Sequence, residues 1–213
     1  MKIDFLKDWV VPNIPKDFWR FFEEQQTEAF HNAHRTTVNS YEESEYLQLV
    51  GHVRHAMSEM AFRNAASQAN LLVESLSTNP VGGKYSLAIR GDFQLLRTNI
   101  QTHCGPPRPS KFRREYAAYN LWLQPQQLGL WHSPPVFLKD KLCGMILVTR
   151  RKKGGDPTVP AYIGLGIPSP DLKSWLGGPY PIQKIIASYS DSGVILLETA
   201  LKLRQQRLHQ TEK

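Results

Sequence analysis

The stretch from residue 41 to residue 76 constrains the fold more than any other part of the chain. Its apolar residues recur at spacings of three and four, as one face of an α-helix requires. These residues are Tyr46, Leu49, Val50, Val53, Met57 and Met60. Ser40, followed three residues later by Glu43, fits a capping box that bonds the free amides of a first helical turn. The pattern predicts one long amphipathic helix over residues 41–76.

The segments on either side of this helix predict a mixed architecture. Residues 15–35 are rich in aromatic side chains and predict a second helix that packs on the first. Further along, the sequence predicts strands at 84–90, 142–150, 159–167 and 183–189, a helix at 111–123, and a last helix capped by Ser190 or Asp191. The predicted fold class is α+β: a helical N-terminal part with a long amphipathic helix, followed by a small, mostly antiparallel sheet with a C-terminal helix. We expect a helical, acidic subdomain over residues 1–80 and a basic α+β part over residues 81–213, within one compact unit.

Composition excludes several classes of protein. With 213 residues, of which 41% are hydrophobic and 21% charged, the chain is neither wholly disordered nor collagen-like. No apolar run reaches the length of a membrane-spanning helix, and residues 1–7 lack the apolar core of a signal peptide. The two cysteines, Cys104 and Cys143, do not have zinc-site spacing. We therefore expect a soluble cytoplasmic protein with reduced thiols, no cofactor and no membrane partner.

Charge is distributed unevenly along the chain. Residues 1–76 contain 7 Lys or Arg against 11 Asp or Glu, a net charge of −4, whereas residues 77–213 contain 19 against 8, a net charge of +11. Such asymmetry predicts an acidic partner for the C-terminal half, which is either DNA or RNA or an acidic protein surface. We expect the acidic helical half to support the fold or to mediate self-assembly.

Two basic clusters are the candidate nucleic-acid-binding residues. They are Arg108, Lys111, Arg113 and Arg114, and Arg150, Arg151, Lys152 and Lys153, the second at the predicted tip of a β-hairpin. Clustered Lys and Arg bind phosphate backbones because binding releases condensed counterions. Trp122, Trp131 or Tyr116 could offer stacking faces to bases if they are exposed. The alternative interpretation is that the charges only keep the protein in solution and that the aromatic residues fill its core.

Motifs for metal binding and catalysis are incomplete. His31 and His34, like His52 and His55, are three residues apart, but the more ordinary interpretation is helix-surface polarity, and we predict no metal. A metal-dependent nuclease would need carboxylates with a nearby lysine, and Asp140, Asp156, Asp171 and Lys173 surround the predicted hairpin. The acidic-x-lysine order at Asp171 occurs without the second acidic element that would complete the motif, so we assign no catalytic residue.

These observations favour a non-enzymatic binding protein whose basic C-terminal half engages a nucleic-acid backbone or another acidic partner. One alternative is a metal-dependent phosphodiesterase or nuclease that uses the hairpin carboxylates. Another is a protein of the assembly or immunity type that binds a protein partner without nucleic-acid contact. Converging carboxylates would favour the former, and an exposed apolar patch on the helical half would favour the latter.

Overall fold

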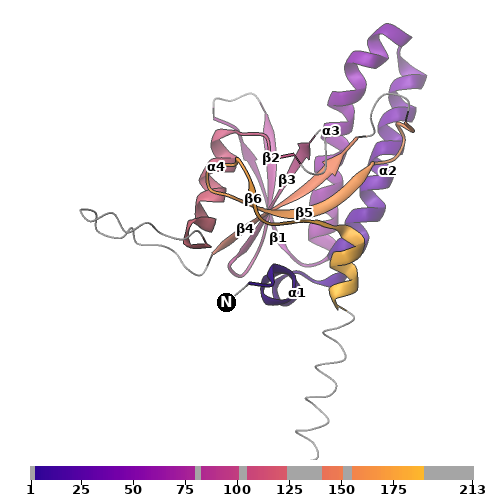
Figure 1. The fold of residues 1–213 in the computed structure, drawn as a ribbon. Coiled ribbons are helices and arrows are strands. Elements are labelled where there is room, and N and C mark those ends of the chain that lie inside the picture. Colours follow the sequence, from indigo (N-terminus) through magenta and orange to yellow (C-terminus); the bar gives the residue numbers. More distant parts are fainter. Residues whose placement is uncertain (1–2, 80–82, 101–104, 124–140, 151–154, 190–213) are drawn as a thin grey trace, which may run out of the picture.

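The N-terminal part of the protein is helical in the computed structural model, which describes residues 3–79, 83–100, 105–123, 141–150 and 155–189. Its elements are a π-helical turn η1 (Leu6–Val10), a short helix α1 (Val11–Asn13), and two long helices, α2 (Lys16–Ser40) and α3 (Glu43–Gln68). The long helices form a hairpin whose tip extends beyond the rest of the molecule (Figure 1). The two predicted N-terminal helices are therefore confirmed, and α2 continues five residues further than expected.

The predicted boundaries of the second long helix are wrong at both ends. Ser40 closes α2, and α3 is preceded by Glu42, which makes no side-chain capping bond, so the capping box does not form. At the other end α3 stops at Gln68, and Asn70 adopts a left-handed conformation with φ of 57°. Asparagine tolerates this region better than most residues. The chain then turns into a strand, so the last part of the predicted helix is extended.

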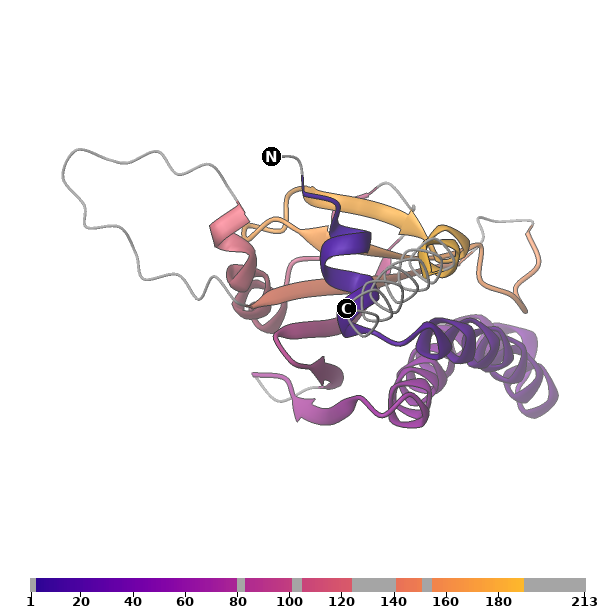
Figure 2. The ribbon, with the colours of Figure 1, turned by 90° about the horizontal axis from the view of Figure 1, so that it is seen from below.

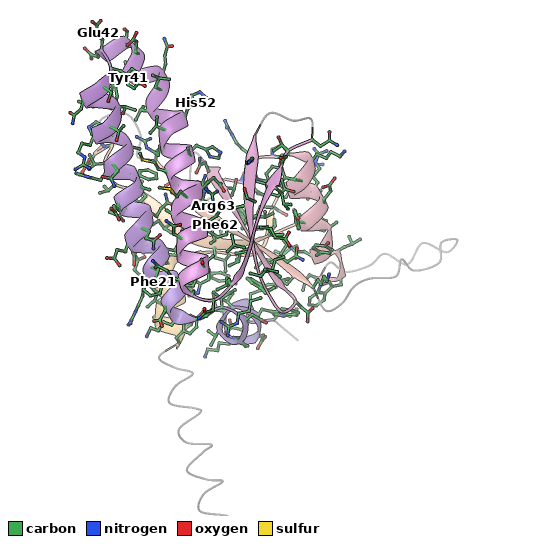
Figure 3. All side chains as sticks on the ribbon, turned by 180° about the vertical axis from the view of Figure 1, so that it is seen from behind. Phe21, Tyr41, Glu42, His52, Phe62 and Arg63 are labelled. Carbon is green, nitrogen blue, oxygen red and sulfur yellow. The ribbon has the colours of Figure 1, made fainter. Side chains whose placement is uncertain are left out.

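The buried face of α3 also differs from the predicted one. Met60 is 50% exposed, and Val53 and Met57 are half-buried, whereas Phe62 is fully buried. The other apolar residues buried along α3 are small: Ala61, Ala65 and Ala66. Figure 3 shows why the two ends of α3 differ, since Phe62 lies at the level of the sheet, whereas the hairpin tip near Tyr41 lies well beyond it.

A six-stranded sheet forms the centre of the molecule. Its strands are β1 (Leu72–Ser77), β2 (Lys84–Arg90), β3 (Phe93–Ile100), β4 (Leu142–Thr149), β5 (Tyr162–Pro168) and β6 (Trp175–Pro181). They lie in sequence order, and all neighbours are antiparallel except β3 and β4, which are parallel. A helix, α4 (Lys111–Ala117), and a 3₁₀ helix, η2 (Ala118–Leu123), lie between β3 and β4 in the chain. The α+β class, the strand at 84–90 and the pairing of β4 with β5 are confirmed.

The segment predicted as a strand at 183–189 is helical, because residues 182–189 form helical turns. Ile182 and Ile185 are buried three residues apart, and Tyr189 packs against the same core, which is helical spacing. This spacing, rather than the alternation that a strand requires, fits the observed conformation. The helix predicted to begin at Ser190 or Asp191 and the hairpin tip at 151–154 lie outside the described residues.

The sheet has an apolar core on each face. On one face, Phe18, Trp19, Phe22 and Phe62 of the long helices join apolar residues of the central strands. On the other face, α4 covers a smaller cluster that includes Met145. Figure 2 shows the sheet between α4 and the α2–α3 hairpin. None of the helices in the described part of the chain has both the length and the apolar character needed to cross a membrane.

Strands β2 and β3 separate before β3 ends. Their pairing runs from Arg90 opposite Phe93 to Leu87 opposite Leu96 and stops there. β3 continues to Ile100 and remains paired with β4 along its whole length. The separation leaves the backbone of β2 without a ladder partner on β3 where the candidate site begins.

Candidate anion-binding site

A carboxylate from α3 occupies the place where the β2–β3 ladder stops. Continuing the register by one residue would put Ser86 opposite Arg97. Instead, the backbone N–H of Ser86 donates to Oε2 of Glu59 over 3.1 Å, and Nε of Arg97 donates to Oε1 over 3.0 Å. Nη2 of Arg97 lies 2.9 Å from the same Oε1, and the Arg97 side chain is 1% exposed. Glu59 thus replaces a strand partner and neutralises a buried guanidinium.

Arg97 also fixes the protonation state of a histidine. Its Nη1 donates to Oδ1 of Asn99 over 2.5 Å, and its Nη2 lies 2.9 Å from Nδ1 of His55. Because a guanidinium only donates, Nδ1 of His55 must accept, so the proton of the neutral ring is on Nε2. Burial, and next the positive charge of Arg97, lower the pKa of His55 below its ordinary value. His55 is therefore a neutral side chain that retains one N–H donor.

Two adjoining cavities, of about 250 and 460 Å³, lie beside this network. The residues that line both are Gly51, His55, Asn99, Arg108 and Arg150. Arg54 lines the smaller cavity, whereas Arg97 and Arg113 line the larger one together with His52. We call the two together the arginine cavity, after Arg54, Arg97, Arg108, Arg113 and Arg150. Figure 3 shows His52 on α3 between the hairpin tip and the level of the sheet.

The topology explains why these side chains converge. Parallel pairing puts Ile100 opposite Thr149, so the carboxyl ends of β3 and β4, with Asn99 and Arg150, lie at the same edge of the sheet. Arg113 lies in the first turn of α4, where its backbone N–H donates to the side chain of Ser110 over 3.4 Å. Nη1 of Arg113 donates to the carbonyl of Arg108 over 3.2 Å, and this bond holds the segment before α4 against the first turn of α4.

The cavity is strongly positive. It is lined by five arginines, and no carboxylate of the described residues lines it. Burial and then the charge of Arg97 lower the pKa of Arg113 to about 10. Burial is also the largest cause of the lowered pKa of Arg54, to which Arg150 adds repulsion. These shifts have the sign expected of cations crowded into a partly dry site without enough counter-charge.

Two guanidinium nitrogens in this cavity are buried without an acceptor. They are Nε of Arg54 and Nε of Arg113, neither of which finds a partner among the described residues. Arg54 is held over the ring of Phe30 at 4.9 Å, and its Nη2 donates to the carbonyl of Pro157 over 3.3 Å. A buried donor without an acceptor costs about 1–3 kcal/mol, so each of these two side chains is held in place at a cost in stability.

The structure brings together three of the eight predicted basic residues, namely Arg108, Arg113 and Arg150. Lys111 and Arg114 are exposed on α4 and line neither cavity. The other three, Arg151, Lys152 and Lys153, lie outside the described residues. Sequence reasoning missed two arginines of the site, Arg54 and Arg97. A signal for Arg97 was present, since it is the one charged residue in the strand 93–100.

The aromatic residues predicted to stack on bases do not line the cavity. Trp122 packs against Trp9, with ring centroids 5.6 Å apart, and its Nε1 donates to the carbonyl of Lys141. Tyr116 packs against the core on the other face of the sheet. Trp131 lies outside the described residues. Among the described residues, the Phe, Tyr or Trp ring that lines the cavity is that of Phe30, which Arg54 covers.

The carboxylates of the nuclease alternative have local partners. Oδ1 of Asp171 accepts from the Ser169 hydroxyl over 2.6 Å and from the Lys173 amide over 3.1 Å, within the turn before β6. Asp156 accepts from the amide and the hydroxyl of Thr158. Asp140 lies outside the described residues. Across the described segments, no group of three or more His, Cys, Asp or Glu side chains is placed to hold a metal ion.

Comparison with known proteins adds no assignment. The chain matches no protein-family model, and no curated protein or solved structure matches it significantly.

Proposed function

We propose that the protein binds nucleic-acid backbones through the arginine cavity, without reading the base sequence. The observation that carries this proposal is the convergence of five arginines from α3, β3, the residue after β4 and the segment at α4 on a cavity that no described carboxylate lines. Arginine presents a planar fork of donors that matches the oxygens of a phosphate. Phosphate groups supply the negative charge that the described lining lacks and acceptors for its arginine donors.

The character of the lining supports binding that is independent of sequence. Its charged groups are donors, which phosphate and sugar oxygens satisfy whatever the bases are. The ring of Phe30 is covered by Arg54, so the described lining offers no free face of a Phe, Tyr or Trp ring for a base. In the sequence, Arg150 is followed directly by Arg151, Lys152 and Lys153, which remain predicted backbone contacts.

The proposal is tested by measuring the binding of fluorescent single strands and duplexes of unrelated sequence by anisotropy, between about 50 and 200 mM salt. The double variant Arg108→Ala/Arg150→Ala removes two exposed guanidiniums that line both cavities. We expect it to weaken binding similarly for every sequence and to reduce the salt slope by about one unit for each lost contact.

The matched control is Lys111→Ala/Arg114→Ala, which removes the same charge from exposed positions of the same region that line neither cavity. We expect the control to lose less than about threefold in affinity and to keep most of the salt slope. Equal losses in the two double variants would show that binding does not depend on the cavity. Undetectable binding by the intact protein at the lowest salt would reject the proposal and favour an acidic protein as the partner.

A further inference from the structure

The charge of the arginine cavity exceeds what one internal phosphate of a strand would neutralise. Glu59 already pairs with Arg97, which leaves the guanidiniums of Arg54, Arg108, Arg113 and Arg150 without a described carboxylate in the cavity. An internal phosphodiester carries a single negative charge, whereas a phosphomonoester carries about 1.5 to 2 near neutral pH. The electrostatic balance therefore favours the group with the higher charge.

The hydrogen-bond donors of the cavity also favour a phosphomonoester over a phosphodiester. The exposed guanidiniums of Arg108 and Arg150 line both cavities, and the neutral ring of His55 keeps a donor on Nε2. A phosphomonoester presents three strongly accepting oxygens, and a phosphodiester only two that are not part of the chain. A terminal phosphate can thus satisfy one more of these donors than an internal phosphate can.

The size of the site is also compatible with the end of a strand. The larger cavity, of about 460 Å³, lies within the size range of small-ligand pockets and has lining from α3, β3, α4 and the residue after β4. A terminal phosphate enters such a pocket with one flanking nucleotide outside it, whereas an internal phosphate carries two. On the basis of the proposed function, we propose that the arginine cavity binds the terminal phosphomonoester of a nucleic-acid strand.

The test compares single strands of one sequence, about 12 nucleotides long, which is a length that one binding module covers. The strands carry a 5′-hydroxyl, a 5′-phosphate, a 5′-phosphate methyl ester or a 3′-phosphate. We expect at least one of the two phosphomonoester strands to bind about tenfold more tightly than the hydroxyl strand, as a charge-assisted contact predicts. The methyl ester lacks the second charge, so it should bind like the hydroxyl strand.

A variant separates recognition of the end from general attraction. Arg113→Lys keeps the positive charge but loses the planar fork of donors. We expect it to reduce the preference for the phosphorylated strand while the salt slope stays close to that of the wild type. Arg108→Lys, at an exposed position of the same cavity, provides the same comparison if the Arg113 variant melts at a lower temperature.

Three results would overturn the inference. Equal, salt-dependent binding of all four strands would reject it and leave the proposed backbone binding intact, whereas no binding of any strand would reject both. A 5′-mononucleotide that binds as tightly as the phosphorylated strand would also contradict it, because the rest of the strand would then contribute nothing.

Discussion

At the scale of single residues, Glu59 is the side chain on which the site depends. It accepts the backbone N–H of Ser86, which has lost its strand partner, and it pairs with Arg97, whose side chain is 1% exposed. A buried guanidinium without a counter-charge is strongly unfavourable. Glu59 therefore permits Arg97 to line the larger cavity without itself lining either cavity.

The change Glu59→Gln should destabilise the fold by about 3 kcal/mol, because it leaves the buried Arg97 without its counter-charge. The glutamine carbonyl can still accept the Ser86 amide, so the loss reports on the ion pair. Urea unfolding measures the change. The double variant Glu59→Gln/Arg97→Met should be more stable than the sum of the two single changes predicts. A loss below about 1 kcal/mol for Glu59→Gln would contradict this role.

At the scale of elements, α3 both supports the core and borders the site. Phe62, in its C-terminal half, packs edge-on against Phe18 and Phe22 of α2, with ring centroids about 6 Å apart. Gly51, Arg54 and His55, about two to three turns earlier, line the arginine cavity. The packing of the C-terminal half of α3 in the core therefore fixes where its N-terminal half borders the cavity.

The two faces of α3 can be compared by truncating Phe62 and Met60. We expect Phe62→Ala to cost about 3–5 kcal/mol, because it opens a void in the core. Met60→Ala, at a position that is 50% exposed, should change stability by less than about 0.5 kcal/mol. Chemical denaturation of both variants measures the difference. Similar losses for the two would mean that the stripe predicted from the sequence, which contains Met60, is the buried one.

The sequence predicted some elements well and others not at all, for physical reasons. β2 and the β4–β5 pair are short apolar runs bounded by turn residues, so their signals are local. Periodicity predicted α3 but not its buried face, because small alanines provide much of that face. β3 was missed, and its parallel pairing with β4 depends on contacts between distant parts of the chain. Since this pairing brings Asn99 and Arg150 together, the site could not be assembled from the sequence.

At the scale of the whole molecule, the site combines the two regions that the charge count separates. Residues 1–76 carry a net charge of −4, yet Arg54 and His55 from that region line the cavity with arginines from residues 77–213. The net charge of a segment predicts the sign of its partner but not which of its side chains face a given cavity. The predicted basic binding surface therefore included Arg108, Arg113 and Arg150 and omitted the contribution of α3.

Gly51 offers the most direct test that the arginine cavity is the binding site. It lines both cavities, and a Cβ placed there would meet no atom within 4 Å. Gly51→Gln and Gly51→Glu add side chains of nearly equal size and similar helix propensity, so both should fold at least as stably as the wild type. The glutamate also adds a negative charge beside the arginines, where it competes with a phosphate.

The decisive measurement is the affinity of the wild type and these two variants for one fluorescent single strand at low salt, with melting temperatures recorded alongside. We predict that Gly51→Gln weakens binding modestly and that Gly51→Glu weakens it at least about tenfold more than Gly51→Gln. Equal affinities for all three proteins, with melting temperatures no lower than that of the wild type, would contradict the assignment of nucleic-acid binding to the arginine cavity.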